Sequence, residues 1–538
     1  MKKKNILFPF FFASAGILAL LSAFFVLFLF ENSFDFNSSF LMFWNSYGLT
    51  VTLLVTVVLN SVVFFSRRDK SNCPTVYFLF VQIFSVMIAS VFHYISYKFI
   101  GSAIIKLLYF IFVCLISSVI SNLTFETLSK NKSKLSMLAQ KNRFTLGIFI
   151  FFVFQIFTKQ NQVDDWVRVW YVLDYKIGFS SRLLPGTILH LFTGDEYISR
   201  LAVKIFLKIT LVLLSLTVSI FLGKFLNSMT EKNSKITIFL SLFYLVSPFS
   251  IAYLWHEHNF GRMETFSLLF ILVGVYLFLK IKNTAFRYIA LNIFWIIGML
   301  CYQGSIFLFF PIVFTVTLCD CENKSKKNIA GFVITIITVC ASFLFVQFAS
   351  SISYSSIEAL KQAYDNRTDM ELQWTSVKYE YFSNIIEAYK SYVFEKISDY
   401  YFRLKAVILL FIISPVLIVL GYCWTKIFVS QNREKIIRTK YFWIFLSNLA
   451  IVPQFLLNID RNRWAAACLS CVFFEIAYFI YINDPSVEKL TSVFQGISKR
   501  AVTYFVIILL YVSVLPKFGA SVYPYPIDEI ITVIMNHT

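Results

Sequence analysis

Long apolar runs alternate with short polar segments from one end of the chain to the other. As a helix, a run of this length crosses about 30 Å of hydrocarbon. Only helices and closed barrels satisfy their backbone groups in lipid, and these runs far exceed barrel strands. The pattern therefore predicts an all-α, polytopic transmembrane bundle of about 13 to 15 spans. The expected spans are 6–30, 40–65, 76–98, 102–124, 144–158, 201–225, 236–255, 265–281, 287–302, 304–319, 329–349, 404–427, 441–458, 464–482 and 501–516.

The basic residues of the short loops indicate the orientation of these spans, because such loops stay in the cytoplasm. With MKKK placed there, every other inner segment is basic as well. We therefore expect a multi-pass protein of the cytoplasmic membrane with a cytoplasmic N-terminus. The inner segments are 66–72, 129–143, 230–235, 280–287, 321–328, 430–440 and the stretch that ends at 497–500.

The apolar stretch 287–319 has basic flanks on both sides, so it must cross an even number of times. We expect a tight hairpin with Tyr302 and Gln303 at its outer tip. The acidic clusters, most of the histidines and most of the arginines outside the inner loops then fall on the outer side. The outer segments are ENSFDFNSS (31–39), the loop 159–200, HEHNFGRME (256–264), the CYQG tip (301–304), the loop 350–403 and IDRNRW (459–464).

The polar chemistry is unevenly divided along the chain. Residues 1–125 are expected to form an N-terminal module of four spans that contains few polar motifs. Residues 126–143 are expected to form a basic cytoplasmic loop. We expect the core to occupy 144–516, with outer loops at 159–200 and 350–403, and a tail at 517–538.

Composition removes several classes of function. The net charge is +19, but only 14% of residues are charged and the mean hydropathy is +0.72. The charges lie between apolar runs, so we expect membrane lipid and no nucleic acid as a partner. Phosphate-loop, G-x-S-x-G and H-E-x-x-H motifs are absent from the sequence. The nine cysteines lie mostly within or beside apolar runs, so no disulfide framework is expected.

The loop 159–200 contains the most polar stretch of the chain, and apolar-aromatic segments lie within the same loop. Residues 166–173 and 183–192 suit helices that lie in the membrane interface, where they would hold Asp164, Asp165 and Asp174 near the surface. Alternatively, the first two aspartates merely cap the helix that begins at Trp166. Capping explains one aspartate better than two.

Interfacial carboxylates beside arginines suit sugar transfer from a polyprenyl-phosphate carrier. The leaving phosphate is a stable anion and needs cations rather than a general acid. One carboxylate is needed to deprotonate or orient the acceptor hydroxyl.

VDDW followed by LDYKIGFSSRLLPG resembles the first outer loop of GT-C glycosyltransferases, which use lipid-phosphate sugars. The chain also resembles bacterial membrane proteins of surface-polysaccharide assembly, which carry DY-x-x-GF-x-x-R and a later D-x-x-RW. The resemblance covers roughly 144–483. It departs from the family in one respect: there the acidic loop usually follows the first span, whereas here four spans precede the core that carries this loop.

The resemblance implies a lipid-linked sugar or oligosaccharide donor, a glycan acceptor and a catalytic base. Asp165 is our first choice for the base and Asp164 the alternate, while Asp174 would orient the acceptor or a cation. The implied substrate-binding residues are Arg182, His256, His258, Arg262, Gln303, Asp460, Arg461 and Arg463.

Other interpretations of these segments stay open. H-x-H can bind a divalent ion such as Mg²⁺ or Mn²⁺ but lacks an adjacent third ligand, and it also suits a polar turn. The arginines of IDRNRW can anchor at lipid headgroups, and the tyrosines of 350–403 can cover an acceptor or mark the interface. A polysaccharide polymerase, a flippase and a non-catalytic assembly factor are the alternative functions. Glu475 is the notable charge at mid-depth of a span.

Overall fold

A computed structural model shows two units along the chain, Met1–Asn142 and Arg143–Thr538. The first four expected spans and the tail 517–538 lie outside the described residues, as does 501–516 apart from Ile508. The second unit starts one residue before the expected core. The described residues are 142–158, 162–194, 197–247, 249–255, 259–323, 325–382, 400–431, 433–452, 461–496 and 508.

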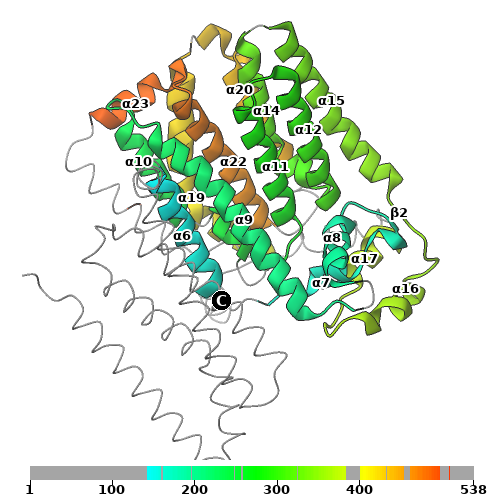
Figure 1. Cartoon of the computed structure of the whole chain (residues 1–538). Coiled ribbons are helices and arrows are strands. Elements are labelled where there is room, and N and C mark those ends of the chain that lie inside the picture. Colours follow the sequence, from blue (N-terminus) through cyan, green and yellow to red (C-terminus); the bar gives the residue numbers. More distant parts are fainter. Residues whose placement is uncertain are drawn as a thin grey trace, which may run out of the picture. The chain divides into compact units, whose positions relative to one another are not determined.

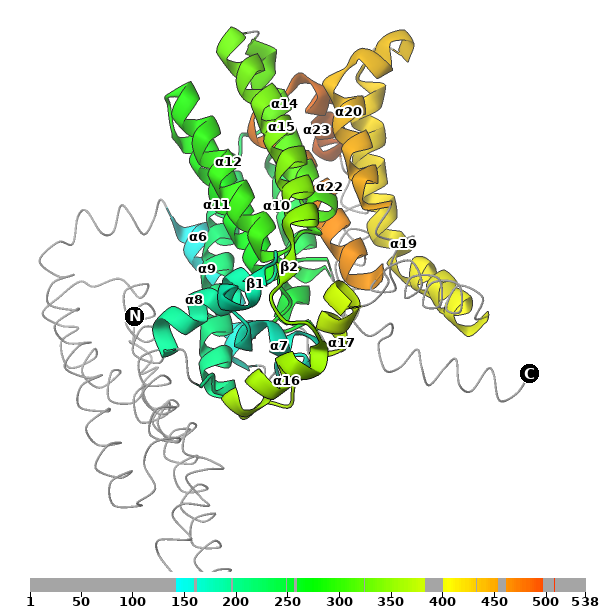
Figure 2. The same cartoon turned by 90° about the vertical axis from the view of Figure 1, so that its right-hand side faces the viewer.

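The described part of the second unit is a helical bundle, which confirms the all-α class (Figures 1 and 2). Its main helices fall on the expected spans. They are α6 Arg143–Thr158, α9 Arg200–Asn227, α10 Ser234–Val246, α11 Glu264–Lys280, α12 Thr284–Cys301, α14 Phe310–Asp320, α15 Lys326–Ala349, α19 Tyr400–Val429, α20 Lys440–Ser447 and α22 Arg461–Tyr481.

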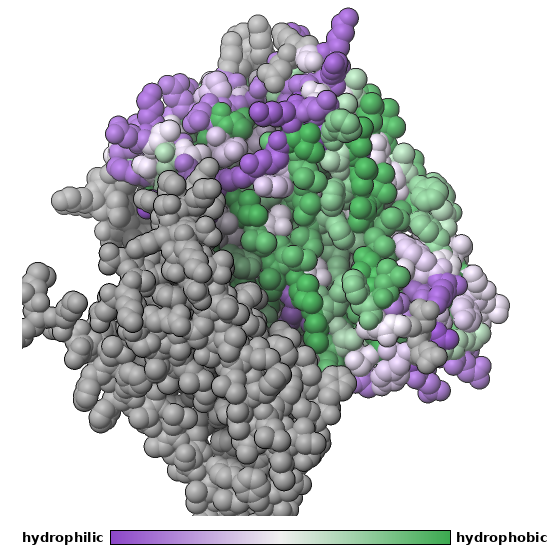
Figure 3. All heavy atoms as spheres, viewed as in Figure 1, coloured by the Kyte–Doolittle hydropathy of each residue, from purple (hydrophilic) through white to green (hydrophobic). Residues whose placement is uncertain are grey.

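Five helical stretches of the described part are long and apolar enough to cross a membrane. These are the helices of a membrane protein, while the total number of spans remains a prediction. Figure 3 shows an apolar surface over these helices, between two hydrophilic ends. The five stretches are Arg200–Asn227, Ser234–Trp255, Thr284–Cys301, Lys326–Ala349 and Arg463–Tyr481.

Three expected spans are interrupted, which corrects the prediction of continuous helices there. After α10, Ser247 is extended because a proline follows it, and the chain resumes as the 3₁₀ turn η3 (Ile251–Trp255). The run 304–319 splits into α13 (Ser305–Leu308) and α14. α20 passes into the 3₁₀ turn η8 (Asn448–Ile451).

The expected hairpin at CYQG is present. α12 ends at Cys301, the chain turns through 302–304, and α13 and α14 lead back along it. Arg287 near the start of α12 binds Asp320 at the end of α14 at 2.5 Å, so the two helices run antiparallel.

Two segments form a cap at one end of the bundle, 162–194 and 351–382 (Figure 2). The strands β1 (Gly178–Phe179) and β2 (Ser351–Ile352) join them as an antiparallel pair. The other cap elements are α7 Asp165–Val172, η2 Tyr175–Ile177, α8 Leu183–Thr193, α16 Ile357–Tyr364, η5 Asp365–Arg367, α17 Thr375–Val377 and η6 Lys378–Phe382.

Two glycines allow the cap to close. A Cβ on Gly178 would lie 2.2 Å from the carbonyl oxygen of Ser351, and the residue has φ +137°. A Cβ on Gly186 would lie 2.0 Å from the carbonyl oxygen of Leu173, so α8 packs directly against the end of α7.

The opposite end of the bundle holds short polar elements that follow the long helices. Lys440 begins α20 there, and Asp484 caps the turn that follows α22. The elements are η4 Cys321–Asn323, η7 Arg433–Arg438, η9 Pro485–Val487 and α23 Glu488–Gln495.

Candidate functional site

Asp164 has two roles in the structure. Its Oδ1 accepts a hydrogen bond from the backbone N–H of Trp166 at 3.0 Å, which caps α7. The same oxygen lies 3.2 Å from the Arg262 guanidinium, and both side chains are largely buried. The capping interpretation therefore holds for Asp164, but it does not account for the buried arginine.

Asp165 lies in the first turn of α7 and pairs with Arg168, one turn further along. Its side chain is 53% exposed, whereas that of Arg168 is buried. Arg168 also donates to the carbonyl oxygen of Val163 at 3.0 Å. This pair anchors α7 and stands outside the buried contacts described below.

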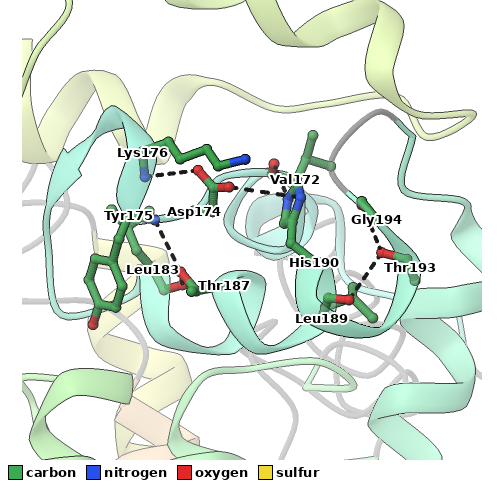
Figure 4. Close-up of polar contacts among 10 residues, drawn as sticks. All are labelled: Val172, Asp174, Tyr175, Lys176, Leu183, Thr187, Leu189, His190, Thr193 and Gly194. Atoms are coloured by element: carbon green, nitrogen blue, oxygen red, sulfur yellow. Dashed lines mark hydrogen bonds and ion pairs between the residues drawn. The ribbon is translucent and has the colours of Figure 1, made fainter.

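Asp174 lies at the other end of α7, where it accepts from the backbone N–H of Lys176 at 3.0 Å (Figure 4). Its Oδ2 faces Nδ1 of the buried His190 at 3.9 Å. His190 Nε2 lies 2.9 Å from the carbonyl oxygen of Val172, so Nε2 carries the proton. These contacts hold the imidazole ring of His190, on α8, against the end of α7.

Arg182 is the centre of a second group. Its guanidinium lies 3.1 Å from Glu380 and stacks near the rings of Trp170 and Tyr302, at 5.3 and 5.6 Å from their centroids. Burial opposes the charge and is the largest single effect, but Glu380 and the smaller contributions of Tyr302 and Tyr381 together outweigh it and raise the pKa of Arg182.

Neutral polar groups surround this ion pair. Ser181 donates to Gln303 Oε1, and Gln303 Nε2 donates to Glu380 at 3.3 Å. Tyr381 lies within hydrogen-bond distance of both Ser180 and Glu380. Burial and the Glu380 charge raise the pKa of Tyr381, so its hydroxyl stays protonated. The predicted hairpin tip and both cap segments thus meet at Arg182.

A third buried pair joins Arg463 at the start of α22 to Glu264 at the start of α11. Their side chains are 6% and 2% exposed. Such a pair needs both partners, because removing one leaves a buried charge without compensation.

The three pairs are close enough to interact. Tyr171 donates to the carbonyl oxygen of Gly261, and burial followed by the charge of Glu264 raises its pKa. The same hydroxyl also senses the charges of Arg262 and Asp164. The charge of Arg463 acts on Arg182 and opposes its protonation. We call these six residues the arginine cluster: Arg182, Arg262 and Arg463 with Glu380, Asp164 and Glu264.

The structure brings together part of the predicted site. The arginine cluster and its surroundings include Asp164, Arg182, Arg262, Gln303 and Arg463, whereas Asp165 and Asp174 make separate contacts. His256, His258 and Asp460 lie outside the described residues, and so does the side chain of Arg461.

The described residues contain no group of three or more histidine, cysteine, aspartate or glutamate side chains that could hold a metal ion. The predicted divalent ion involved His256 and His258, which are not among them. Metal binding therefore stays a prediction.

Sequence reasoning missed two of the three acidic partners of the cluster, Glu264 and Glu380. Glu264 stands in the quoted HEHNFGRME, but its place at the start of an apolar run was its only signal. Glu380 lies among the tyrosines of the long loop. His190 was also missed, as the pairing with Asp174 arises from the packing of α8 on α7.

The fold and the site define an all-α protein with membrane-spanning helices and a buried arginine cluster under a cap. Comparisons with protein-family models, curated proteins and solved structures give no match to this chain.

Proposed function

We propose that the protein is a membrane glycosyltransferase that takes a sugar or oligosaccharide from a polyprenyl-phosphate or pyrophosphate donor. The reaction would take place outside the cytoplasmic membrane, during assembly of a cell-surface glycan. The observation that carries this proposal is the arginine cluster, in which three buried arginines from separate segments approach one another.

The cluster supplies what a departing phosphate requires. Guanidinium groups donate paired hydrogen bonds to phosphate, and their effect is greatest where water is excluded. Arg182 is bound to Glu380 in the structure, so the donor phosphate would displace that carboxylate from the guanidinium group. Trp170, Tyr302 and Tyr381 provide aromatic surfaces beside it, which suit the faces of a sugar.

Asp164 fits the role of base better than Asp165. Transfer to an acceptor hydroxyl needs one carboxylate that is held in place near the phosphate-binding cations. Asp164 is fixed by the cap of α7 and by Arg262. Asp165 is half-exposed and bound to Arg168. We therefore assign the base to Asp164, the alternate of the sequence-based prediction. A polysaccharide polymerase would use the same groups on a longer donor.

The test compares lipid-linked saccharides extracted from cells that make native protein, no protein, Arg182→Gln or Arg287→Gln at matched membrane levels. Arg287 is the matched control, because it forms a similar arginine–aspartate pair beside aromatic rings at the opposite end of α12. Mass spectrometry then identifies any saccharide that accumulates.

We expect the deletion and Arg182→Gln to accumulate the same unprocessed intermediate, whose mass gives the substrate. Arg287→Gln should match native protein. If only the deletion changes the profile, the cluster takes no part in transfer, and the protein is a carrier or an assembly factor.

A further inference from the structure

Glu475 is a buried carboxyl group far from the arginine cluster. It lies in α22 twelve residues after Arg463, which is about 18 Å along the helix. Its side chain is fully buried inside a stretch that is long and apolar enough to cross a membrane. Ionisable groups in such positions are costly and have a specific partner.

The partner is Asn448, at the junction of α20 and η8. Its Nδ2 lies 2.8 and 2.9 Å from the two carboxyl oxygens of Glu475. Asn448 Oδ1 is also buried, and no donor among the described residues reaches it. The pair therefore lacks two things. The buried carboxyl group has a neutral amide and no positive charge as its partner, and the amide oxygen has no hydrogen-bond donor.

One proton on Glu475 removes both deficits. A carboxylic acid and a primary amide form a cyclic pair, in which the acid O–H donates to Oδ1 and Nδ2 donates to the acid carbonyl oxygen. Nδ2 already contacts both carboxyl oxygens, and the cyclic pair requires the amide group to turn until Oδ1 faces one of them. An ionised Glu475 would instead leave a charge in hydrocarbon-like surroundings with one neutral donor.

The surroundings offer no other compensation within the described part of the chain. The titratable groups that sense Glu475 are thiols, Cys468 and Cys471 on α22 and Cys319 on α14. Lys440 and Asp484, which act on Cys319 together with Glu475, bind each other at the end of the bundle. No described cation pairs with Glu475.

We propose that Glu475 and Asn448 form a proton-binding site within the bundle, in which Glu475 is a neutral acid that donates to Asn448 Oδ1. The ligand is a proton, and the pair links η8 to α22. Losing this proton would leave an uncompensated charge between the two elements, so proton exchange would loosen their contact. The inference does not depend on the proposed transferase function.

Infrared difference spectroscopy tests the proposal on the full chain in lipid nanodiscs at neutral pH. A protonated carboxyl group has a C=O stretching band above the amide band, and the band shifts in D₂O. Subtracting the Glu475→Gln spectrum from the native one should leave such a band. The exposed Glu488 is the matched control, and Glu488→Gln should leave no band. Equal native and Glu475→Gln spectra in this region would overturn the proposal.

Asn448→Leu provides a second measurement in case Glu475→Gln does not fold. It keeps the acid but removes Oδ1 as its acceptor. The carboxyl band should therefore remain and move to higher frequency. A band that stays at the native frequency would show that Asn448 is not the acceptor and would contradict the proposed site.

Discussion

The two ends of the bundle both contain buried ion pairs, but they are built differently. At the end away from the cap, Lys440 lies between Asp484 and Glu322, at 2.5 and 2.6 Å, and Arg287 binds Asp320. These pairs join neighbouring helix ends, and the group that two of them share is a single cation, Lys440, between two carboxylates. At the cap, the arginine cluster brings Arg182 and Arg463 close enough for their positive charges to oppose each other.

This difference separates a structural role from a binding role. Ion pairs that only fasten helices do not need like charges to gather. A cluster of arginines costs free energy until an anion neutralises it, and in the structure three carboxylates do so. We therefore propose that the cap end binds an anion, whereas the pairs of the opposite end only join helix ends.

The largest effect is expected at Arg463. Arg463→Met should destabilise the protein by about 3 to 5 kcal/mol, because Glu264 is left as a buried charge without a partner. Thermal unfolding in detergent measures this. Arg463→Met with Glu264→Leu should recover most of the stability, since apolar side chains replace both charges. If the double variant is no more stable than the single one, the pair is not the cause.

The closure of the cap depends on Gly178. Gly178→Ala should cost about 1 to 3 kcal/mol, because of its positive φ, and should also push β1 away from Ser351. Limited proteolysis should then cleave the cap faster than in native protein. The control is Gly421→Ala, since a Cβ there meets nothing within 4 Å. Equal cleavage of both variants would contradict the role of Gly178.

Replacing each of the two aspartates at the start of α7 should have a different effect on transfer activity. Asp164→Asn keeps a good N-cap but removes the negative partner of Arg262, so transfer should fall by about 100-fold. Asp165→Asn loses a pair whose carboxylate is half-exposed and which contributes about 1 kcal/mol to stability, and Arg168 keeps its hydrogen bond to Val163, so activity should stay near native. Turnover of an isolated lipid-linked donor decides between them. The reverse result would restore Asp165 as the base.

The smallest effect on stability near neutral pH is expected when the Lys440–Asp484 pair is changed. Burial opposes the Asp484 charge, but the hydrogen bonds from Lys440, Tyr441 and the Ser486 backbone, with the charge of Lys440, together outweigh it and lower the pKa of Asp484 from its usual value. A lowered pKa stabilises the folded state above that value, and the contribution is lost as pH falls through the folded pKa. Asp484→Asn should therefore reduce the acid dependence of thermal unfolding below about pH 3.8. If the unfolding temperatures of Asp484→Asn and native protein fall equally as the pH is lowered, this prediction is wrong.

The helices could largely be predicted because apolar runs end abruptly at polar residues. α9 and α12 begin at caps, Ser199 and Asn283, that directly precede apolar runs. The breaks could be predicted less well. The interruption at Ser447 and Asn448 depends on tertiary packing, in which Asn448 binds Glu475.

The arginines of the site could be predicted, but not their partners. Charge placement in loops put Arg182, Arg262 and Arg463 on one side, and the structure places them at one end. Sequence spacing carries no information on contacts between residues as far apart as Glu264 and Arg463. For the same reason the sequence favoured Asp165 over Asp164 as the base, whereas in the structure Asp164 is the one that faces Arg262.

The most direct test of the cap end as an anion site is the binding of a polyprenyl phosphate to purified protein, measured beside the uncharged polyprenol. The account predicts that native protein and Arg287→Gln prefer the phosphate equally. Arg182→Gln should raise the Kd for the phosphate by about tenfold or more, since a hydrogen bond to a charged group contributes roughly 1.5 to 3 kcal/mol. Equal Kd values for Arg182→Gln and native protein, or no preference for phosphate over polyprenol, would contradict it.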